Sequence, residues 1–251
     1  MFLPIGDEPN PSEHLPLVTI GLIAINVAIF LLLALPLGAR APDPNDPVLA
    51  DYLRAIVPQL PAGTSVQAVL QRVTAYDLLL FRWGFRASAP SLTTLLTGMF
   101  LHGGLLHVAG NMLYLWVYGN NVEDRLGRVG FLFWYLVTGI VATLAQVLLN
   151  PSSPIPLVGA SGAISGVLGF YLIWFPRNVV KVFVFLFPFY IGVVRVSATL
   201  MLIAFLILDN LLPLLISHGR SGIAYSAHIG GFLVGAAAAW LMRRKGAPSS
   251  E

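Results

Sequence analysis

Residues 159–175 read GASGAISGVLGFYLIWF, in which a serine stands among small residues at the head of an apolar run. If residues 161–175 form a helix, its length is about 22 Å, against a hydrocarbon core of about 30 Å. With its inner end at Pro176 and Arg177, Ser161 lies below the outer surface of the membrane. A polar group at that depth needs a water-filled cavity, so position alone makes Ser161 a functional candidate.

The whole chain has the composition of a membrane protein. Of its 251 residues, 57% are hydrophobic and 10% are charged, and the mean hydropathy is +0.82; soluble proteins carry charge on about a quarter of their residues. A formal net charge of +3 without a long basic run argues against nucleic acid as a partner. Cysteine is absent, so no disulfide, thiolate nucleophile or cysteine-based metal site is expected, and no cofactor or metal is predicted.

Six apolar segments have the character of membrane spans. They lie at residues 17–38, 105–122, 129–149, 161–175, 196–216 and 226–242. Residues 182–194 are also apolar but too few to span, and we expect them to be interfacial or re-entrant. The sequence therefore predicts an all-α polytopic membrane protein of six transmembrane helices. One domain, 17–243, lies between short tails at 1–16 and 244–251.

Basic residues near the predicted helix ends indicate the orientation. The inner side would hold Arg125, Arg128, Arg177, Lys181, Arg243, Arg244 and Lys245, and the short outer connections only Arg220. Six spans then place both termini in the cytoplasm. Residues 1–16 contain no Lys or Arg, which favours a retained first span over a cleaved signal peptide. Glu123, Asp124 and Arg125 are expected to form a local ion-pair cap at the inner end of the second span.

A long outer loop, about residues 39–104, separates the first span from the second. Thr64 or Ser65 is expected to cap a short helix within it, and the Arg82–Trp83 region suits the level of the lipid headgroups. Loops of this length are usually functional, although a plain spacer is the alternative.

Four polar side chains share the outer leaflet in this topology. Ser161 begins the fourth span and His228 the sixth, while His107 and Asn111 project from one face of the second. Small residues let the fourth and sixth helices approach closely and bring Ser161 within hydrogen-bond reach of His228. These residues are Gly162, Gly166, Gly169, Gly231 and Gly235.

The arrangement predicts a serine–histidine dyad. An imidazole that accepts the proton of a serine hydroxyl makes the oxygen nucleophilic and later returns the proton to the leaving amine. The backbone N–H of Ser161 and the side chains of His107 and Asn111 are candidate donors to the oxyanion. Nothing in the spacing of Asp209 ties it to His228. The alternative is a glycine-mediated helix pair without chemistry.

Four motifs occur in order between about residues 88 and 243. They are Phe100-Leu101-His102-Gly103-Gly104-Leu105-Leu106-His107 followed by Asn111, Val122-Glu123 with Arg125-Leu126-Gly127, Gly159-Ala160-Ser161-Gly162-Ala163, and Ala227-His228-Ile229-Gly230-Gly231. On these motifs the chain resembles the rhomboid intramembrane serine proteases in their bacterial or archaeal six-helix form. By this resemblance Ser161 is the nucleophile, His228 its base, His107 and Asn111 part of the oxyanion hole, and His102 structural. Gly159, Gly162, Gly231 and Gly235 are expected to be structural beside the site.

The resemblance implies a serine endopeptidase that cleaves single-pass transmembrane proteins in the bilayer of a prokaryotic cell membrane. The active site would face the outer side, the long loop would lie partly in the outer leaflet, and the fifth helix would be a lateral gate. Three residues at two places depart from some members: Thr93-Thr94 stands where they have a Trp-Arg pair, and Ser165 stands where they have an aromatic residue that stacks on the histidine.

Two other functions are weighed against proteolysis. A non-proteolytic rhomboid-like protein that binds membrane clients would be marked by loss of Ser161 or His228, and both are present. A small-solute transporter would be expected to show paired inverted repeats, which the sequence does not show. No oligomeric state is predicted.

Overall fold

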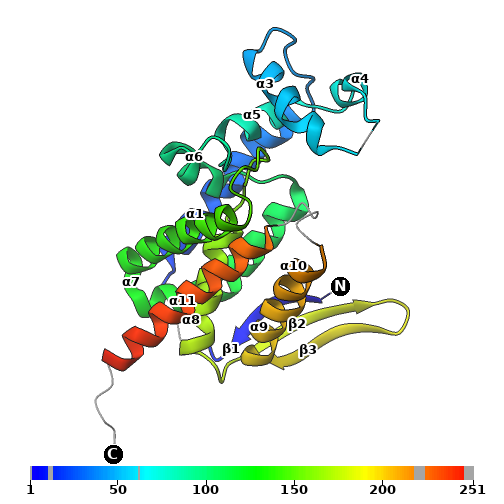
Figure 1. Cartoon of the computed structure of the whole chain (residues 1–251). Helices are drawn as coiled ribbons and strands as arrows, with labels where there is room; N and C mark the ends of the chain where they lie inside the picture. The colour runs from blue at the N-terminus through cyan, green and yellow to red at the C-terminus, as the bar shows by residue number, and fades with distance from the viewer. Residues whose placement is uncertain (1, 11–13, 62, 218–223, 246–251) are drawn as a thin grey trace, which may run out of the picture. The chain divides into compact units, whose positions relative to one another are not determined.

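The computed structural model describes residues 2–10, 14–61, 63–217 and 224–245 (Figure 1). Arg220 and residues 246–251 lie outside the described residues, as do the side chains of Arg244 and Lys245, so the orientation predicted from them stays a prediction. The chain divides into two compact units. The first unit comprises Met1–Ile23, Ala109–Gln146 and Ser161–Glu251, and the second comprises Ala24–Val108 and Val147–Ala160.

Four helical stretches of the described chain are long and apolar enough to cross a membrane. They are Leu17–Gly38, which joins α1 (Leu17–Ile29), η1 (Phe30–Ala34) and α2 (Leu35–Gly38); α7 (Leu105–Leu149); Ala198–Ile216, within α9 (Ala198–Leu206), η4 (Ile207–Leu211) and α10 (Leu212–Ser217); and Tyr225–Arg243, within α11 (Tyr225–Lys245). Helix α8 (Ser161–Trp174) is apolar but shorter. The chain is therefore a predominantly helical integral membrane protein.

Helix α7 is broken near its middle. Gly127 has φ 70° and ψ 163°, which lie outside the helical region, so two helical arms meet at this residue. A straight helix of 45 residues would be about 68 Å long, more than twice the hydrocarbon core. The arms, 105–126 and 128–149, overlap the predicted second and third spans, while the count of six spanning helices stays a prediction.

The all-α prediction is wrong in one part of the first unit. Three antiparallel strands, β1 (Phe2–Glu8), β2 (Val179–Leu186) and β3 (Tyr190–Ser197), form a sheet in the order β1-β2-β3 (Figure 1). Residues 182–194, expected as one interfacial or re-entrant segment, form most of the β2–β3 hairpin, and the expected N-terminal tail contributes β1. The alternating burial of β2, in which Val180, Val182 and Val184 are buried, is the two-residue period of a strand.

Helix α8 packs against α11 through backbone contacts, as the glycines predicted (Figure 1). A Cβ atom added at Gly231 would lie 2.2 Å from the carbonyl oxygen of Gly162, and one at Gly235 would lie 2.0 Å from that of Gly166. Real side chains cannot approach a carbonyl so closely, so only glycine permits this helix spacing. The expected close approach of the fourth and sixth predicted helices is confirmed.

Buried carboxylates tie other elements of the first unit together. Glu123 of α7 accepts hydrogen bonds from the N–H groups of Val18 (2.9 Å) and Thr19 (2.7 Å) and from the Thr19 hydroxyl (2.7 Å). It thus caps α1, because the first N–H groups of a helix lack intrahelical partners. Asp7 of β1 accepts hydrogen bonds from Asn121 at 2.5 Å and from Tyr171.

The segment expected as a long outer loop contains several short helices in the second unit. These are α3 (Pro47–Ile56), η2 (Val57–Gln59), α4 (Val66–Leu70), α5 (Ala75–Trp83), α6 (Leu92–Thr97) and η3 (Gly98–Phe100). The Ser65 hydroxyl accepts a hydrogen bond from Ala68 N–H at 3.1 Å, so of the two alternatives for this cap, Thr64 and Ser65, the structure confirms Ser65. Leu49, Val73 and Leu78 form a small buried cluster. Partial embedding of this segment in a membrane stays a prediction.

Candidate active site

Ser161 is the first residue of α8 and follows a turn that requires glycine. Gly159 has φ 120°, in the region that side chains disfavour, and its N–H donates to the carbonyl of Gly98 at 2.9 Å. The turn accounts for the glycine at this position. It also leaves the backbone N–H of Ser161 at a helix N-terminus, where amides have no intrahelical partner.

His228 lies in the first turn of α11 and meets Ser161 directly. Its Nε2 lies 2.8 Å from the Ser161 hydroxyl oxygen. The backbone contact between Gly231 and Gly162 holds the two helices at the spacing that this hydrogen bond needs. The structure therefore brings together the two residues predicted as nucleophile and base.

Asn210 is a third member of this constellation that the sequence reasoning missed. Its side-chain oxygen lies 2.7 Å from Nδ1 of His228, and its side chain is only 1% exposed. The sequence did not tie the carboxylate of the preceding residue, Asp209, to His228, and the structure shows that side chain exposed. The available signal was the amide itself, because a polar side chain within an apolar span is a functional hypothesis by default.

The position of Ser165, one turn after Ser161, offers no ring to stack on His228. Ser165 is buried in α8. The nearby ring comes instead from α9, where the centroid of Phe205 lies 6.5 Å from that of His228, with 31° between the planes. Two side chains from the α9–η4 region, Asn210 and Phe205, thus adjoin the imidazole.

The predicted oxyanion donors His107 and Asn111 lie on α7 but in different units, His107 in the second and Asn111 in the first. Asn111 is buried, and its Nδ2 has no hydrogen-bond partner among the described residues. An unpartnered buried donor is costly, which suits a group that binds an acceptor during a reaction. Nδ1 of His107 accepts a hydrogen bond from Gly103 N–H at 3.4 Å. The roles of both residues stay predictions.

His102 is enclosed by the second unit. The hydroxyl of Tyr76 donates to its carbonyl at 2.8 Å, and its ring meets that of His107 edge to face with centroids 5.1 Å apart. Burial, and then the neighbouring His107, lower the pKa of His102 to about 4, so its ring is neutral at pH 7. A buried neutral ring held by local contacts suits the structural role expected for it.

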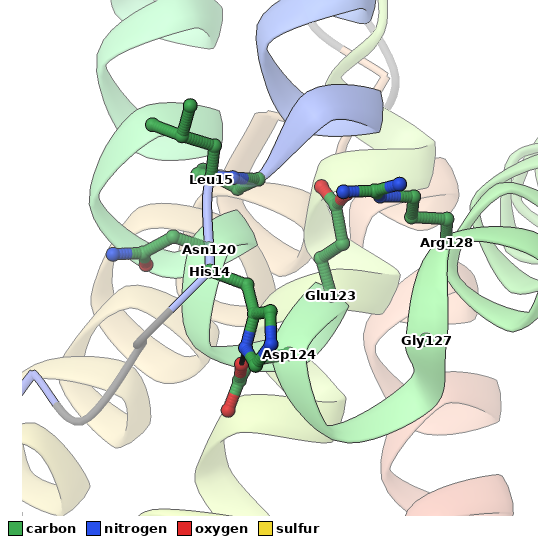
Figure 2. Close-up of a pocket in the computed structure, with 8 residues that line it drawn as sticks. His14, Leu15, Asn120, Glu123, Asp124, Gly127 and Arg128 are labelled. Atoms are coloured by element: carbon green, nitrogen blue, oxygen red, sulfur yellow. Dashed lines mark ion pairs between the residues drawn. The ribbon is translucent and has the colours of Figure 1, made fainter.

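A separate cavity of about 280 Å³ lies in the first unit (Figure 2). It is lined by His14, Leu15, Pro16, Asn120, Glu123, Asp124, Gly127 and Arg128. Figure 2 shows the His14 ring facing Asp124, whose carboxylate lies 3.9 Å away.

The local ion-pair cap expected from Glu123, Asp124 and Arg125 does not form. Glu123 caps α1 instead, and the guanidinium of Arg125 lies 4.7 Å from the ring centroid of Trp174.

Comparison with known proteins identifies the relatives of this chain. The family described as the rhomboid domain matches residues 89–245. The rhomboid protease GluP of Bacillus subtilis is 47% identical over 75 residues, which cover 30% of this chain and 14% of GluP. Rhomboid-like protein 11, chloroplastic, of Arabidopsis thaliana is 28% identical over 169 residues, 62% of this chain and 54% of that protein.

A mitochondrial relative gives a similar match. Rhomboid protein 1, mitochondrial, of Saccharomyces cerevisiae is 28% identical over 165 residues, 61% of this chain and 43% of that protein. The matches thus cover about half or less of the length of these curated relatives.

Proposed function

The chain belongs to the rhomboid family, and we propose that it is an intramembrane serine endopeptidase that acts through Ser161 and His228. The observation that carries the proposal is the 2.8 Å contact between the Ser161 hydroxyl and Nε2 of His228, set at the ends of two apolar helices. A nucleophile and a base within hydrogen-bond reach are the minimum for covalent acyl transfer. A polar pair among apolar helices is otherwise costly to keep.

The first half-reaction forms an acyl-enzyme. Ser161 Oγ attacks the carbonyl carbon of the scissile peptide bond while His228 Nε2 accepts the hydroxyl proton. The negative charge moves to the carbonyl oxygen, which the backbone N–H of Ser161 and the side chains of His107 and Asn111 would stabilise. As the C–N bond breaks, His228 returns the proton to the leaving amine.

The second half-reaction regenerates the serine. A water molecule gives a proton to His228 and attacks the ester carbon, and a second tetrahedral intermediate forms on the same donors. The bond from carbon to Ser161 Oγ breaks, the new carboxyl end departs, and the proton on His228 returns to Ser161.

Single-pass transmembrane proteins are the proposed substrates, cleaved after a small residue where the helix unwinds. An intact helix hides its carbonyl groups in hydrogen bonds, so the scissile bond must become extended to reach a nucleophile. We place the site toward the outer side of a prokaryotic cell membrane, with both termini cytoplasmic.

The test is cleavage of a model single-pass substrate by the chain reconstituted in vesicles. The wild type is expected to cleave, and Ser161→Ala is expected to lose at least about 1,000-fold in rate, because the nucleophile is gone. Ser165→Ala is the matched control, a second buried serine one turn along the same helix, and is expected to cleave at the rate of the wild type. A serine-reactive fluorophosphonate should label the wild type and the control at Ser161.

Three outcomes would overturn the proposal. Cleavage by Ser161→Ala at the wild-type rate would assign the activity elsewhere. Absence of both cleavage and labelling in the folded wild type would favour a non-proteolytic rhomboid-like protein. Co-purification of the uncleaved substrate with the chain would then identify client binding. Coupled solute flux without labelling would point to a transporter.

A further inference from the structure

We propose that Asn210 is a positioning residue for His228, which it holds so that Nε2 presents its lone pair to Ser161. The inference rests on the proposed function, because it assigns how the base of that reaction is oriented. It is carried by the 2.7 Å contact between Asn210 Oδ1 and His228 Nδ1. Nδ1 and Nε2 of one imidazole are thus engaged by two different helices.

The orientation of the Asn210 amide follows from its second contact. Its Nδ2 donates to the carbonyl oxygen of Phe205 at 2.8 Å, and a carbonyl can only accept. The oxygen of the amide must therefore face Nδ1 of His228, which can hydrogen-bond to it only as an N–H donor. A neutral imidazole with its proton on Nδ1 carries a lone pair on Nε2 that can accept the Ser161 proton, and the network assigns this tautomer.

The local backbone explains why Asn210 points inward. It lies in η4, a turn of π-helix in which Leu212 N–H bonds to the carbonyl of Ile207, five residues back. A regular α-helix closes this bond four residues back, so the turn holds one extra residue, and within it Asn210 is buried while its neighbour Asp209 is exposed. Such π-bulges occur often at functional sites.

A residue that orients His228 must come from outside α8, because α8 has no aromatic side chain at position 165. Ser165 supplies no ring beside the histidine, and Asp209, whose side chain is exposed, makes no hydrogen bond to it among the described residues. Phe205, whose ring centroid lies 6.5 Å from that of His228, and Asn210 are both on the helical segment that precedes α11 in the chain. The helical stretch Ala198–Ile216 therefore sets the orientation of the His228 ring. The contact between α8 and α11 sets its distance to Ser161.

The test measures the rate at which a fluorophosphonate labels Ser161, together with kcat and KM for the model substrate. Asn210→Leu, similar in size but without an acceptor, is expected to slow labelling and kcat on the order of 100-fold, because the imidazole loses its fixed tautomer. KM is expected to change by less than about twofold, since substrate contacts remain. Asp209→Asn, adjacent but exposed, is the control and should match the wild type.

Asn210→Asp separates positioning from folding. It keeps an oxygen toward Nδ1, so it should label at least about tenfold faster than Asn210→Leu. Equal labelling of Asn210→Leu and Asp209→Asn, or equal loss in the Leu and Asp variants when both are folded, would overturn the inference. If the wild type itself neither labels nor cleaves, the proposed function fails instead.

We also infer that the β2–β3 hairpin contacts the bilayer through its turn and the adjoining part of β3, independently of any catalytic role. This hairpin surface comprises Phe187, Phe189, Ile191 and Val193. All four are exposed, Phe189 at 90% and Phe187 at 73%. A soluble surface rarely exposes so many large apolar side chains together.

The hairpin is joined in the chain to a helical stretch that is long enough to span a membrane. Strand β3 ends at Ser197 and α9 begins at Ala198, so the strand leads directly into a helical stretch long enough to span. That stretch exposes Leu200 and Ile203. The charged side chains lie at the other end of the hairpin, where Lys181 and Arg195 both contact Glu8. Aromatic side chains at the turn of a hairpin whose other end leads into a span suit the membrane interface.

A cysteine-free chain makes this inference directly testable. A nitroxide is attached to Phe189→Cys, to Leu200→Cys as the lipid-facing reference and to Asn45→Cys, in the Pro- and Asp-rich stretch, as the aqueous reference. In phosphatidylcholine–phosphatidylglycerol vesicles, the Phe189 label is expected to collide readily with oxygen and poorly with a water-soluble nickel chelate, as the Leu200 label does. Ile191→Cys repeats the measurement in case the turn does not tolerate the label.

Two results would contradict lipid contact. Nickel accessibility equal to that at Asn45 would place the hairpin surface in water. Strong dipolar broadening between labels would show that a second copy of the chain covers it.

Discussion

His228 is held by two neighbouring helical segments in two different ways. Helix α11, which carries His228, contacts α8 through backbone atoms: Gly231 and Gly235 lie against the carbonyl oxygens of Gly162 and Gly166. Toward η4 the contact is made by side chains, chiefly the amide of Asn210. A backbone contact sets a distance and tolerates almost no added atom, whereas a side-chain hydrogen bond sets an orientation and can be exchanged for another acceptor.

Gly235→Ala tests the backbone contact and should have the largest effect on stability. The new Cβ would lie 2.0 Å from the carbonyl oxygen of Gly166, so α8 and α11 must move apart. We expect a loss of about 3 kcal/mol in the free energy of unfolding in detergent micelles, together with slower fluorophosphonate labelling.

Gly110→Ala is the matched control for that substitution. Gly110 also lies in a helix, but an added Cβ would meet nothing within 4 Å. Its free energy of unfolding should stay within about 1 kcal/mol of the wild type, or rise, because alanine favours a helix. Equal losses in the two variants would mean that glycine packing does not set the α8–α11 distance.

Glu123→Gln tests a polar side-chain contact away from the candidate site. The carboxylate accepts three hydrogen bonds from Val18 and Thr19, and an amide can replace only one of its two oxygens. We expect a loss of about 2 kcal/mol in the free energy of unfolding, with labelling of Ser161 unchanged in the folded fraction.

Asp124→Asn, at the next position, is the control for Glu123→Gln. Its side chain is exposed and its contact with His14 is long, at 3.9 Å, so its effect should be under about 0.5 kcal/mol. If the two variants lost the same stability, the cap on α1 would contribute nothing beyond a surface charge.

Asp7→Asn tests a contribution to stability that depends on pH. Burial raises the pKa of Asp7 above its ordinary value, because desolvation of the carboxylate outweighs the hydrogen bonds from Tyr171, Asn178 and Asn121. The folded state therefore holds the proton more tightly than the unfolded chain does. That contribution to stability is present at low pH and is lost as the pH rises through the raised pKa.

The measurement is the Tm of the wild type and of Asp7→Asn across a pH series that begins near 4. The Tm of the wild type should fall relative to that of the variant as the pH rises, because only the wild type must bury an ionised group. A difference that is constant with pH, or one that changes in the opposite direction, would show that Asp7 titrates as it does in the unfolded chain.

Prediction from sequence succeeded for features that depend on the type of a residue and on its spacing from near neighbours in the chain. The close helix pair was predicted from its glycines, and the pair places Ser161 beside His228. These glycines are Gly162, Gly166, Gly169, Gly231 and Gly235. Ser65 capped its helix as its residue type indicated. The strands at residues 182–194 were not predicted, because hydropathy measures whether a segment can span and does not register the two-residue alternation of a strand. The interfacial position expected for this segment stays a prediction.

By itself the sequence determined an integral membrane protein of the rhomboid family and the serine–histidine pair, because apolar length and local motifs are properties of the chain. Only the tertiary structure decided that Asn210 meets His228. A π-turn changes which side of a helix a residue occupies, and no spacing rule for a regular helix contains that change. The same holds for β1, whose strand exists because β2, more than 170 residues later in the chain, supplies its hydrogen-bond partners.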